Sequence, residues 1–179
     1  EPITFGPLIL QNLREITSLD FDVHMMVENP SKYFDDLVNV GADSITIHYE
    51  ACESLTEILG LLEQLDVRTS VAINPQTNVD ELFPYLNRMD QAVVMSVNPG
   101  YGGQTFIEDT LEKISSLKQY IEDHSFDVDI QVDGGINERT ARKAVLSGAD
   151  ILVAGSAVFN QNFSVCDGIK AIRHQYKGL

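Results

Sequence analysis

Two polar side chains, His24 and Asp133, have the types and positions expected of a catalytic or metal-binding pair. His24 lies near the end of one β-rich run, and Asp133 follows another directly before Gly134-Gly135. Imidazole and carboxylate groups commonly bind divalent metals and commonly act as acids or bases. Each residue alone has a plainer explanation, because a strand histidine is usually a core residue and an Asp before two glycines often forms a turn. If both point into one cavity, they indicate a shared metal or proton transfer.

Three further side chains are candidates to line the same cavity. His48 ends a second β-rich run and is a candidate third member of the group, although its sequence context is less telling. Met26 and Met95 lie near the ends of β-rich runs. Most methionines are simply core residues, but these two could form a soft, dry wall around a reacting carbon.

Two short glycine motifs, Gly134-Gly135 and Gly155-Ser156, follow the last two β-rich runs and precede helical segments. Glycine lets backbone N–H groups approach a phosphate without a Cβ in the way, and a helix amino terminus adds favourable partial charge. One such motif is more simply explained as a tight turn. Two of them after successive final strands favour a phosphate site, which is common at this place in (β/α)8 barrels.

A third glycine-rich segment, Asn98–Gln104, contains Gly100, Tyr101, Gly102 and Gly103. The plain interpretation is a mobile surface loop. We favour a lid that closes over a ligand and excludes water.

Short β-rich runs alternate with helical segments along the whole chain and place these residues at strand ends. The β-rich runs are Phe21–Val27, Ser44–His48, Val67–Ile73, Ala92–Val97, Val128–Val132 and Ile151–Ala154. The expected helices are Pro7–Ile16, Pro30–Val40, Ser54–Leu65, Val79–Leu86, Glu108–Ile121, Glu138–Ser147 and Val165–Tyr176. Such alternation predicts parallel strands with helical crossovers, and therefore an α/β fold.

The runs themselves alternate between apolar and polar residues. In Ser44–His48, Ile45 and Ile47 oppose three polar side chains. An open sheet with helices on both faces would be apolar on both, whereas the inner face of a barrel can carry polar groups toward its mouth. We therefore predict one domain over residues 1–179 with the (β/α)8 TIM-barrel fold; a half-polar sheet in some other α/β domain is the alternative. Gly41 and Gly148 begin two similar joints, each ending a helix just before a strand.

Composition restricts the classes of function. The formal net charge is −15, which argues against nucleic-acid binding because that depends on Lys and Arg contacts to phosphate. No run approaches the roughly 18 apolar residues of a membrane helix. Cys52 and Cys166 are far apart and lack metal-ligand spacing, so we expect a cytoplasmic protein without a disulfide framework.

Four segments together resemble the ribulose-phosphate 3-epimerase family in order and spacing, and the resemblance covers essentially the whole chain. They are Asp22–Val27 (DVHMMV), Met95–Gln104 (MSVNPGYGGQ), Val132–Asn137 (VDGGIN) and Ala154–Phe159 (AGSAVF). Four long motifs in register are far more specific than any single glycine pattern.

The resemblance implies interconversion of D-ribulose 5-phosphate and D-xylulose 5-phosphate in the pentose phosphate pathway, with one divalent metal (zinc, iron, manganese or cobalt). It implies that His24 and Asp133 are metal ligands and that Asp133 is also one of two acid–base carboxylates. Substrate and phosphate contacts would come from His24, Gly100, Tyr101, Gly102, Gly103, Gly134, Gly135, Gly155 and Ser156, and Met26, Met95 and His48 would line the pocket.

The sequence departs from the family in its number of strands. The family has eight strands, whereas six runs occur here, and Thr4–Pro7 resembles the segment just after the family's second strand. We therefore expect that strand 1, helix 1 and strand 2 are absent from the sequence as given, together with a His ligand, the partner carboxylate and an early Ser. The chain alone should then be inactive. Its two open strand edges should make it unstable or lead it to pair with another chain, as in a homo-oligomer.

Two alternatives stay open. One is an epimerase for a six-carbon ketose phosphate such as allulose 6-phosphate, although Gly134-Gly135 and Asn98–Gly103 look more like the five-carbon type. The other is a fragment that binds sugar phosphate without turning it over. A decarboxylase of the same superfamily is less well supported, because no D-x-K-x-x-D pattern occurs on a strand.

Overall fold

The computed structural model describes residues 5–177, and its centre is a sheet of six parallel strands in chain order. The strands are β1 (Asp22–Met25), β2 (Ser44–His48), β3 (Arg68–Ile73), β4 (Gln91–Met95), β5 (Asp129–Asp133) and β6 (Ile151–Val153). All six predicted β-rich runs are confirmed as strands, with ends that shift by at most two residues. Thr4, which carries part of the predicted resemblance upstream of the first helix, lies outside the described residues.

The connections between strands are mostly helical. The α-helices are α1 (Pro7–Arg14), α2 (Phe34–Asn39), α3 (Leu55–Leu62), α4 (Thr110–His124), α5 (Glu138–Leu146) and α6 (Val165–His174). Short 3-10 helices are η1 (Pro30–Tyr33), η2 (Tyr49–Ala51), η3 (Val79–Glu81) and η4 (Phe83–Arg88).

Two details of the helix prediction are wrong. The segment Val79–Leu86, expected as one helix, forms the separate 3-10 helices η3 and η4. Pro84 lies in the first turn of η4 and has no N–H to donate, so an α-helix cannot run through this point unbroken. The segment Pro30–Val40, also expected as one helix, begins as the 3-10 helix η1 and continues as α2, and the side chain of Asn29 makes no capping hydrogen bond at its start.

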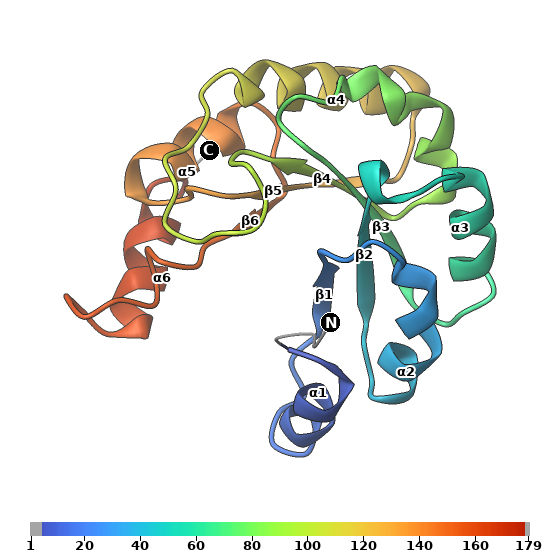
Figure 1. Ribbon diagram of the computed structural model, residues 1–179. Coiled ribbons are helices and arrows are strands. Elements are labelled where there is room, and N and C mark those ends of the chain that lie inside the picture. Colours follow the sequence, from blue (N-terminus) through green and yellow to red (C-terminus); the bar gives the residue numbers. More distant parts are fainter. Residues whose placement is uncertain (1–4, 178–179) are drawn as a thin grey trace.

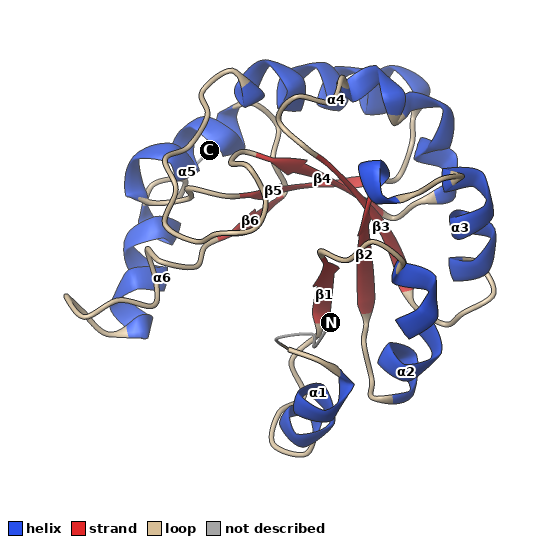
Figure 2. Cartoon of the chain, in the orientation of Figure 1, coloured by secondary structure: helices blue, strands red, loops and turns tan. Residues whose placement is uncertain are grey.

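The sheet curls into part of a barrel, and the helices lie only on its convex outer side (Figures 1 and 2). Within residues 5–177, β1 pairs only with β2 and β6 pairs only with β5, so the ring of strands is not closed. An open sheet with helices on both faces is excluded. The prediction of an incomplete TIM barrel with six strands is therefore confirmed.

Side chains on the two faces of the sheet differ as the alternation predicted. Ile45 and Ile47 on β2 are fully buried in the main core, which fills the space between the sheet and its helices. Burying a side chain of this size contributes about 1.5–3 kcal/mol. The inner face carries a small apolar cluster of Ala72, Val93 and Met95. Polar residues share that face: Thr46, Ser70, Gln91 and Gln131 are all at most 2% exposed.

The amino ends of the strands are joined by a recurring aspartate. Asp43, Asp90 and Asp150 lie directly before β2, β4 and β6. Each carboxylate accepts a hydrogen bond from a backbone N–H at the start of the neighbouring strand (β1, β3 or β5), at 2.7, 2.7 and 2.9 Å. The donors are Phe21, Thr69 and Ile130. Because a carboxylate makes strong bonds to backbone N–H groups, each aspartate fixes two neighbouring strands in register.

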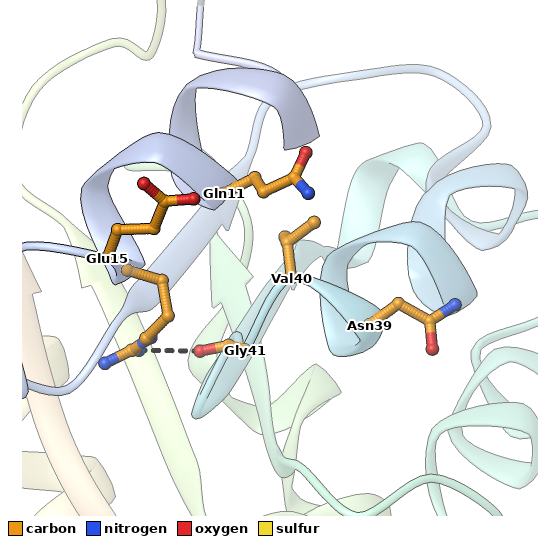
Figure 3. A pocket seen from close by; sticks show the side chains of 6 residues that line it. Gln11, Glu15, Asn39, Val40 and Gly41 are labelled. Carbon is orange, nitrogen blue, oxygen red and sulfur yellow. Dashed lines mark hydrogen bonds between the residues drawn. The ribbon is translucent and has the colours of Figure 1, made fainter.

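Arg14 attaches α1 to the rest of the fold at this same end. Its guanidinium donates to the carbonyl of Gly41 at 2.6 Å and to Asp43 Oδ2 at 2.7 Å, and it lies 3.7 Å from the centre of the Phe21 ring. Figure 3 shows the bond to Gly41 beside an open cavity of about 310 Å³ between α1 and α2. Gly41 ends α2 with φ +87°, as predicted for the joint. This cavity lies at the amino end of the strands, away from His24 and Asp133.

Candidate active site

His24 and Asp133 meet inside the curled sheet although 109 residues separate them in the chain. His24 lies on β1 and Asp133 ends β5, and the Nδ1 of His24 is 3.2 Å from the Oδ2 of Asp133. Their side chains are 17% and 20% exposed. The two side chains thus share one partly covered site at the carboxyl ends of the strands, which is where TIM barrels place their catalytic groups.

His48, at the end of β2, extends this pair to a row of three. Its Nε2 lies 2.9 Å from the Nε2 of His24, and the two rings are stacked with centres 5.0 Å apart. His48 is only 6% exposed. The structure therefore brings all three sequence-predicted polar residues together.

Glu50, which the sequence analysis did not single out, holds the other side of His48. Its Oε2 lies 3.5 Å from the Nδ1 of His48, and its Oε1 accepts the N–H of Asn74 at 2.8 Å and the hydroxyl of Thr77. Burial alone would raise the pKa of this carboxyl. The hydrogen bonds from His48, Thr77 and Asn74 outweigh burial and hold the pKa of Glu50 at about 2.

The loop after β3 is clamped from two sides. Lys113, on α4, donates to the carbonyls of Asn74, Pro75 and Thr77, while Glu50 binds the same loop from the other side. Burial lowers the pKa of Lys113. The only sequence signal for this clamp was the position of Glu50 just beyond a strand end. Lys113 gave no signal, because a lysine on a helix is usually in solvent.

The His24–Asp133 pair fits two ligands of a divalent metal. Ligands about 2.0–2.1 Å from a tetrahedral ion are about 3.3 Å apart, and the two atoms here are 3.2 Å apart. A tetrahedral site needs four ligands. Among residues 5–177, no group of three or more His, Cys, Asp or Glu side chains is arranged to hold a metal, so the described part of the chain offers a partial ligand set.

Comparison with known proteins agrees with this geometry. Residues 1–159 match the model of the ribulose-phosphate 3 epimerase family. The chain belongs to this family. It is 40% identical to a ribulose-phosphate 3-epimerase of Bacillus subtilis over 89% of this chain and 74% of the relative. It is 37% identical to the chloroplastic ribulose-5-phosphate-3-epimerase of Arabidopsis thaliana over 96% of this chain and 61% of the relative.

Solved structures support the fold of this epimerase-family chain. Orotidine 5'-phosphate decarboxylase from Pyrococcus horikoshii superposes with a TM-score of 0.70 at 16% identity, covering 97% of this chain and 81% of that one. Thiamine phosphate pyrophosphorylase from Pyrococcus furiosus gives a TM-score of 0.68 at 19% identity, covering 99% and 78%. At these identities the likeness concerns the fold alone.

In this epimerase-family chain, Gly134 and Gly135 are glycines for a reason internal to the fold. Both have positive φ, +121° and +61°. A Cβ on Gly134 would lie 2.4 Å from a side-chain carbon of Val97, and one on Gly135 would lie 2.6 Å from the backbone nitrogen of Phe106. The hydroxyl of Ser96 donates to the carbonyl of Gly134 at 2.6 Å. A tight turn thus accounts for both glycines, and any phosphate contact would be additional.

Gly155 and Ser156 are different, because both are exposed and Gly155 has no atom within 4 Å of an added Cβ. The carbonyl of Gly155 accepts the N–H groups of Val158 and Phe159, each at 2.9 Å. The turn after β6 is therefore ordered by its own backbone while its outer surface stays open.

The glycine-rich segment expected as the lid of this family stands open. An added Cβ on Gly100, Gly102 or Gly103 would meet nothing within 4 Å, and Tyr101 is 85% exposed. Gln104 donates to the carbonyls of Asn98 and Tyr101 at 2.6 and 2.8 Å. The loop has internal order, and its Asn98 side chain accepts a hydrogen bond from Gln76 at 2.8 Å, while its glycines and Tyr101 stay exposed.

The two methionines predicted to line the pocket have different environments. Met95 is 1% exposed on the inner face, in the small cluster with Ala72 and Val93. Met26 is 49% exposed just beyond the end of β1. Met95 is therefore part of the inner wall, whereas Met26 faces open space.

No helix within residues 5–177 is long and apolar enough to cross a membrane.

Proposed function

We propose that this chain carries the larger part of a cytoplasmic ribulose-phosphate 3-epimerase, which interconverts D-ribulose 5-phosphate and D-xylulose 5-phosphate in the pentose phosphate pathway. The observation that carries the proposal is the convergence of His24 and Asp133 at 3.2 Å, on two distant strands of a family member.

Asp133 is one of the two proton-transfer groups. Inverting a carbon next to a ketone requires a base to remove its proton on one face and an acid to return one on the other. The carboxylate of Asp133 faces the inside of the barrel and is 20% exposed, so a substrate can reach it. A bound zinc, iron, manganese or cobalt ion, held in part by His24 and Asp133, would polarise the ketone and stabilise the negative charge that develops on its oxygen.

The second group does not come from the described residues. Glu50 is the other carboxylate near His24, but its oxygens are already bonded to Asn74, Thr77 and His48. Asp22 is at the far end of β1 and accepts a hydrogen bond from Gln131 at 2.6 Å. The 179-residue chain alone is therefore inactive, and a strand–helix–strand unit that closes the ring between β6 and β1 would supply the missing carboxylate and ligands.

The remaining contacts to substrate follow from the turns at the strand ends. The phosphate lies at the turns after β5 and β6, where Gly134, Gly135, Gly155 and Ser156 present backbone N–H groups. The lid Gly100–Gly103, with Tyr101, closes over the sugar when it is bound, and Met26 moves against it. A closed, dry pocket protects the reactive intermediate from bulk water.

A chimera tests the proposal. The chain is joined to the strand–helix–strand unit of the Bacillus subtilis relative, and formation of D-xylulose 5-phosphate is followed by NMR with Zn²⁺ or Mn²⁺ present. We expect turnover by the chimera and none by the 179-residue chain. Epimerisation by the chain alone, or an inactive but folded chimera, would contradict the proposal. Rates on allulose 6-phosphate in parallel decide between five- and six-carbon substrates.

The role of Asp133 has its own variant. In the chimera, Asp133→Asn should abolish turnover while binding of inorganic phosphate survives. The matched control is Asp129→Asn at the other end of the same strand, where the carboxylate pairs with Arg68 at the surface. It should keep its activity. A protein that binds phosphate but shows no turnover even as a complete barrel would favour the non-enzymatic alternative.

A further inference from the structure

A row of polar side chains runs from Asp133 through His24 and His48 to Glu50, which binds the loop after β3. Asp133 faces Nδ1 of His24, Nε2 of His24 faces Nε2 of His48, and Nδ1 of His48 faces Glu50, at 3.2, 2.9 and 3.5 Å. Each neutral imidazole has one N–H and one bare nitrogen. The position of one proton therefore dictates the position of the next.

Glu50 determines where the first proton in this row of side chains lies. Its pKa of about 2 means that the carboxylate is ionised at neutral pH and can only accept hydrogen bonds. The Nδ1 of His48 must then carry the proton that points to Glu50, which leaves its Nε2 bare. The Nε2 of His24, 2.9 Å away, must in turn carry a proton to donate to it.

This assignment leaves a bare Nδ1 on His24 pointing at the carboxylate of Asp133. Two acceptors 3.2 Å apart are unfavourable unless a positive charge lies between them. A proton can serve there, and so can a divalent cation bound by both atoms. Without Glu50, the two rings could adopt the opposite tautomers, in which His24 Nδ1–H simply donates to Asp133 and cannot bind a cation.

We propose that Glu50 is a positioning residue: acting through His48, it fixes which nitrogen of His24 is protonated and keeps Nδ1 free for a cation shared with Asp133. This inference rests on the proposed function in taking the shared charge to be a metal ion. Carboxylates and other groups that orient a metal-binding histidine typically change affinity about 10–100-fold when removed.

The isosteric variant Glu50→Gln is expected to reverse the tautomers of both His48 and His24. The oxygen of the amide can keep the bonds to Asn74 and Thr77, while its NH₂ group donates to Nδ1 of His48. His48 must then be protonated at Nε2, His24 must accept there, and His24 Nδ1 must carry the proton. The matched control is Glu81→Gln, which removes one carboxylate that accepts a hydrogen bond from the Tyr49 hydroxyl at 2.7 Å.

Nitrogen-15 NMR of the imidazole rings in the 179-residue chain measures the tautomers directly. We expect His48 to be protonated at Nδ1 in the wild type and in Glu81→Gln, and at Nε2 in Glu50→Gln. Zn²⁺ titration against a chromophoric chelator should show an affinity about 10–100-fold weaker for Glu50→Gln than for the other two. Glu81→Gln controls for the loss of one carboxylate charge, and circular dichroism shows whether each variant is folded.

The inference is overturned if His48 in the wild-type chain is protonated at Nε2, a result that needs no variant to fold. It is also overturned if folded Glu50→Gln keeps the wild-type pattern, or binds Zn²⁺ equally well. A tautomer reversal in a chain that binds no Zn²⁺ would support the role of Glu50 and contradict the metal in the proposed function.

Discussion

Replacing Gly134 with alanine should destabilise the fold by an amount that can be worked out from the turn after β5. The added Cβ would lie 2.4 Å from a side-chain carbon of Val97 and 2.9 Å from its backbone nitrogen, and φ is +121°. A side chain forced into such a backbone conformation costs about 1–3 kcal/mol, and overpacking costs about as much again. The free energy of unfolding should therefore fall by about 2–6 kcal/mol.

Urea unfolding followed by circular dichroism measures this loss. For a chain of this size the melting temperature falls by about 2–4 °C per kcal/mol. The control Gly102→Ala has no contact within 4 Å and no positive φ, so it should change stability by less than about 0.5 kcal/mol. Adding Val97→Ala to Gly134→Ala removes the side-chain clash but not the backbone strain. The double variant should then lose about 1 kcal/mol less than the sum of the single variants. A loss below about 1 kcal/mol for Gly134→Ala, or strict additivity with Val97→Ala, would refute this account of the turn.

Two further predictions follow from titrating groups. Glu50 has a folded pKa of about 2 against 4.5 for the free side chain, so its contribution to stability is present above about pH 4.5 and is lost as the pH falls through 2. This contribution to the free energy of unfolding is about 1–2 kcal/mol after allowing for the partial exposure of Glu50. The difference in urea stability between wild type and Glu50→Gln should therefore shrink from pH 6 to pH 2.5. A difference that stays constant over this range would contradict the prediction. Burial raises the pKa of Cys52 to about 11, so iodoacetamide at pH 8 should modify exposed Cys166 and leave Cys52 intact in the folded chain, as mass spectrometry of the peptides can test.

The fold could be predicted from sequence where the residue pattern of a short segment depends on the place of that segment in the fold. Apolar–polar alternation gave the strands and the face that points inward, and Gly41 and Gly148 marked two helix ends, both with positive φ. Asp90 makes the same bond to a neighbouring strand as Asp43 and Asp150 do. None of these three bonds was predicted. The 3-10 helix η4 was missed because helical spacing does not reveal where a proline, here Pro84, interrupts the hydrogen bonds.

The candidate site also contains some residues that could be predicted from the sequence and others that could not. His24, His48 and Asp133 could be predicted because strand ends meet at one edge of a parallel sheet. Glu50 and Lys113 could not, since their importance depends on a loop that folds between them, and sequence spacing carries no information on that contact. For Gly134 and Gly135 the residue type was noted correctly, yet the contacts of Val97 and Phe106 explain it without a phosphate.

The site also has a structural consequence for the open barrel. β1 is a four-residue edge strand that pairs with β2 alone among the described strands. Two contacts hold it across the interior to β5: Gln131 to Asp22 at 2.6 Å, and His24 to Asp133 at 3.2 Å. The second contact is favourable only when a positive charge lies between its two acceptors, if Glu50 sets the tautomers as proposed. A cation bound between these two atoms would link β1 to β5. It would therefore stabilise the curvature of the sheet and also bring the two ligands of the site together.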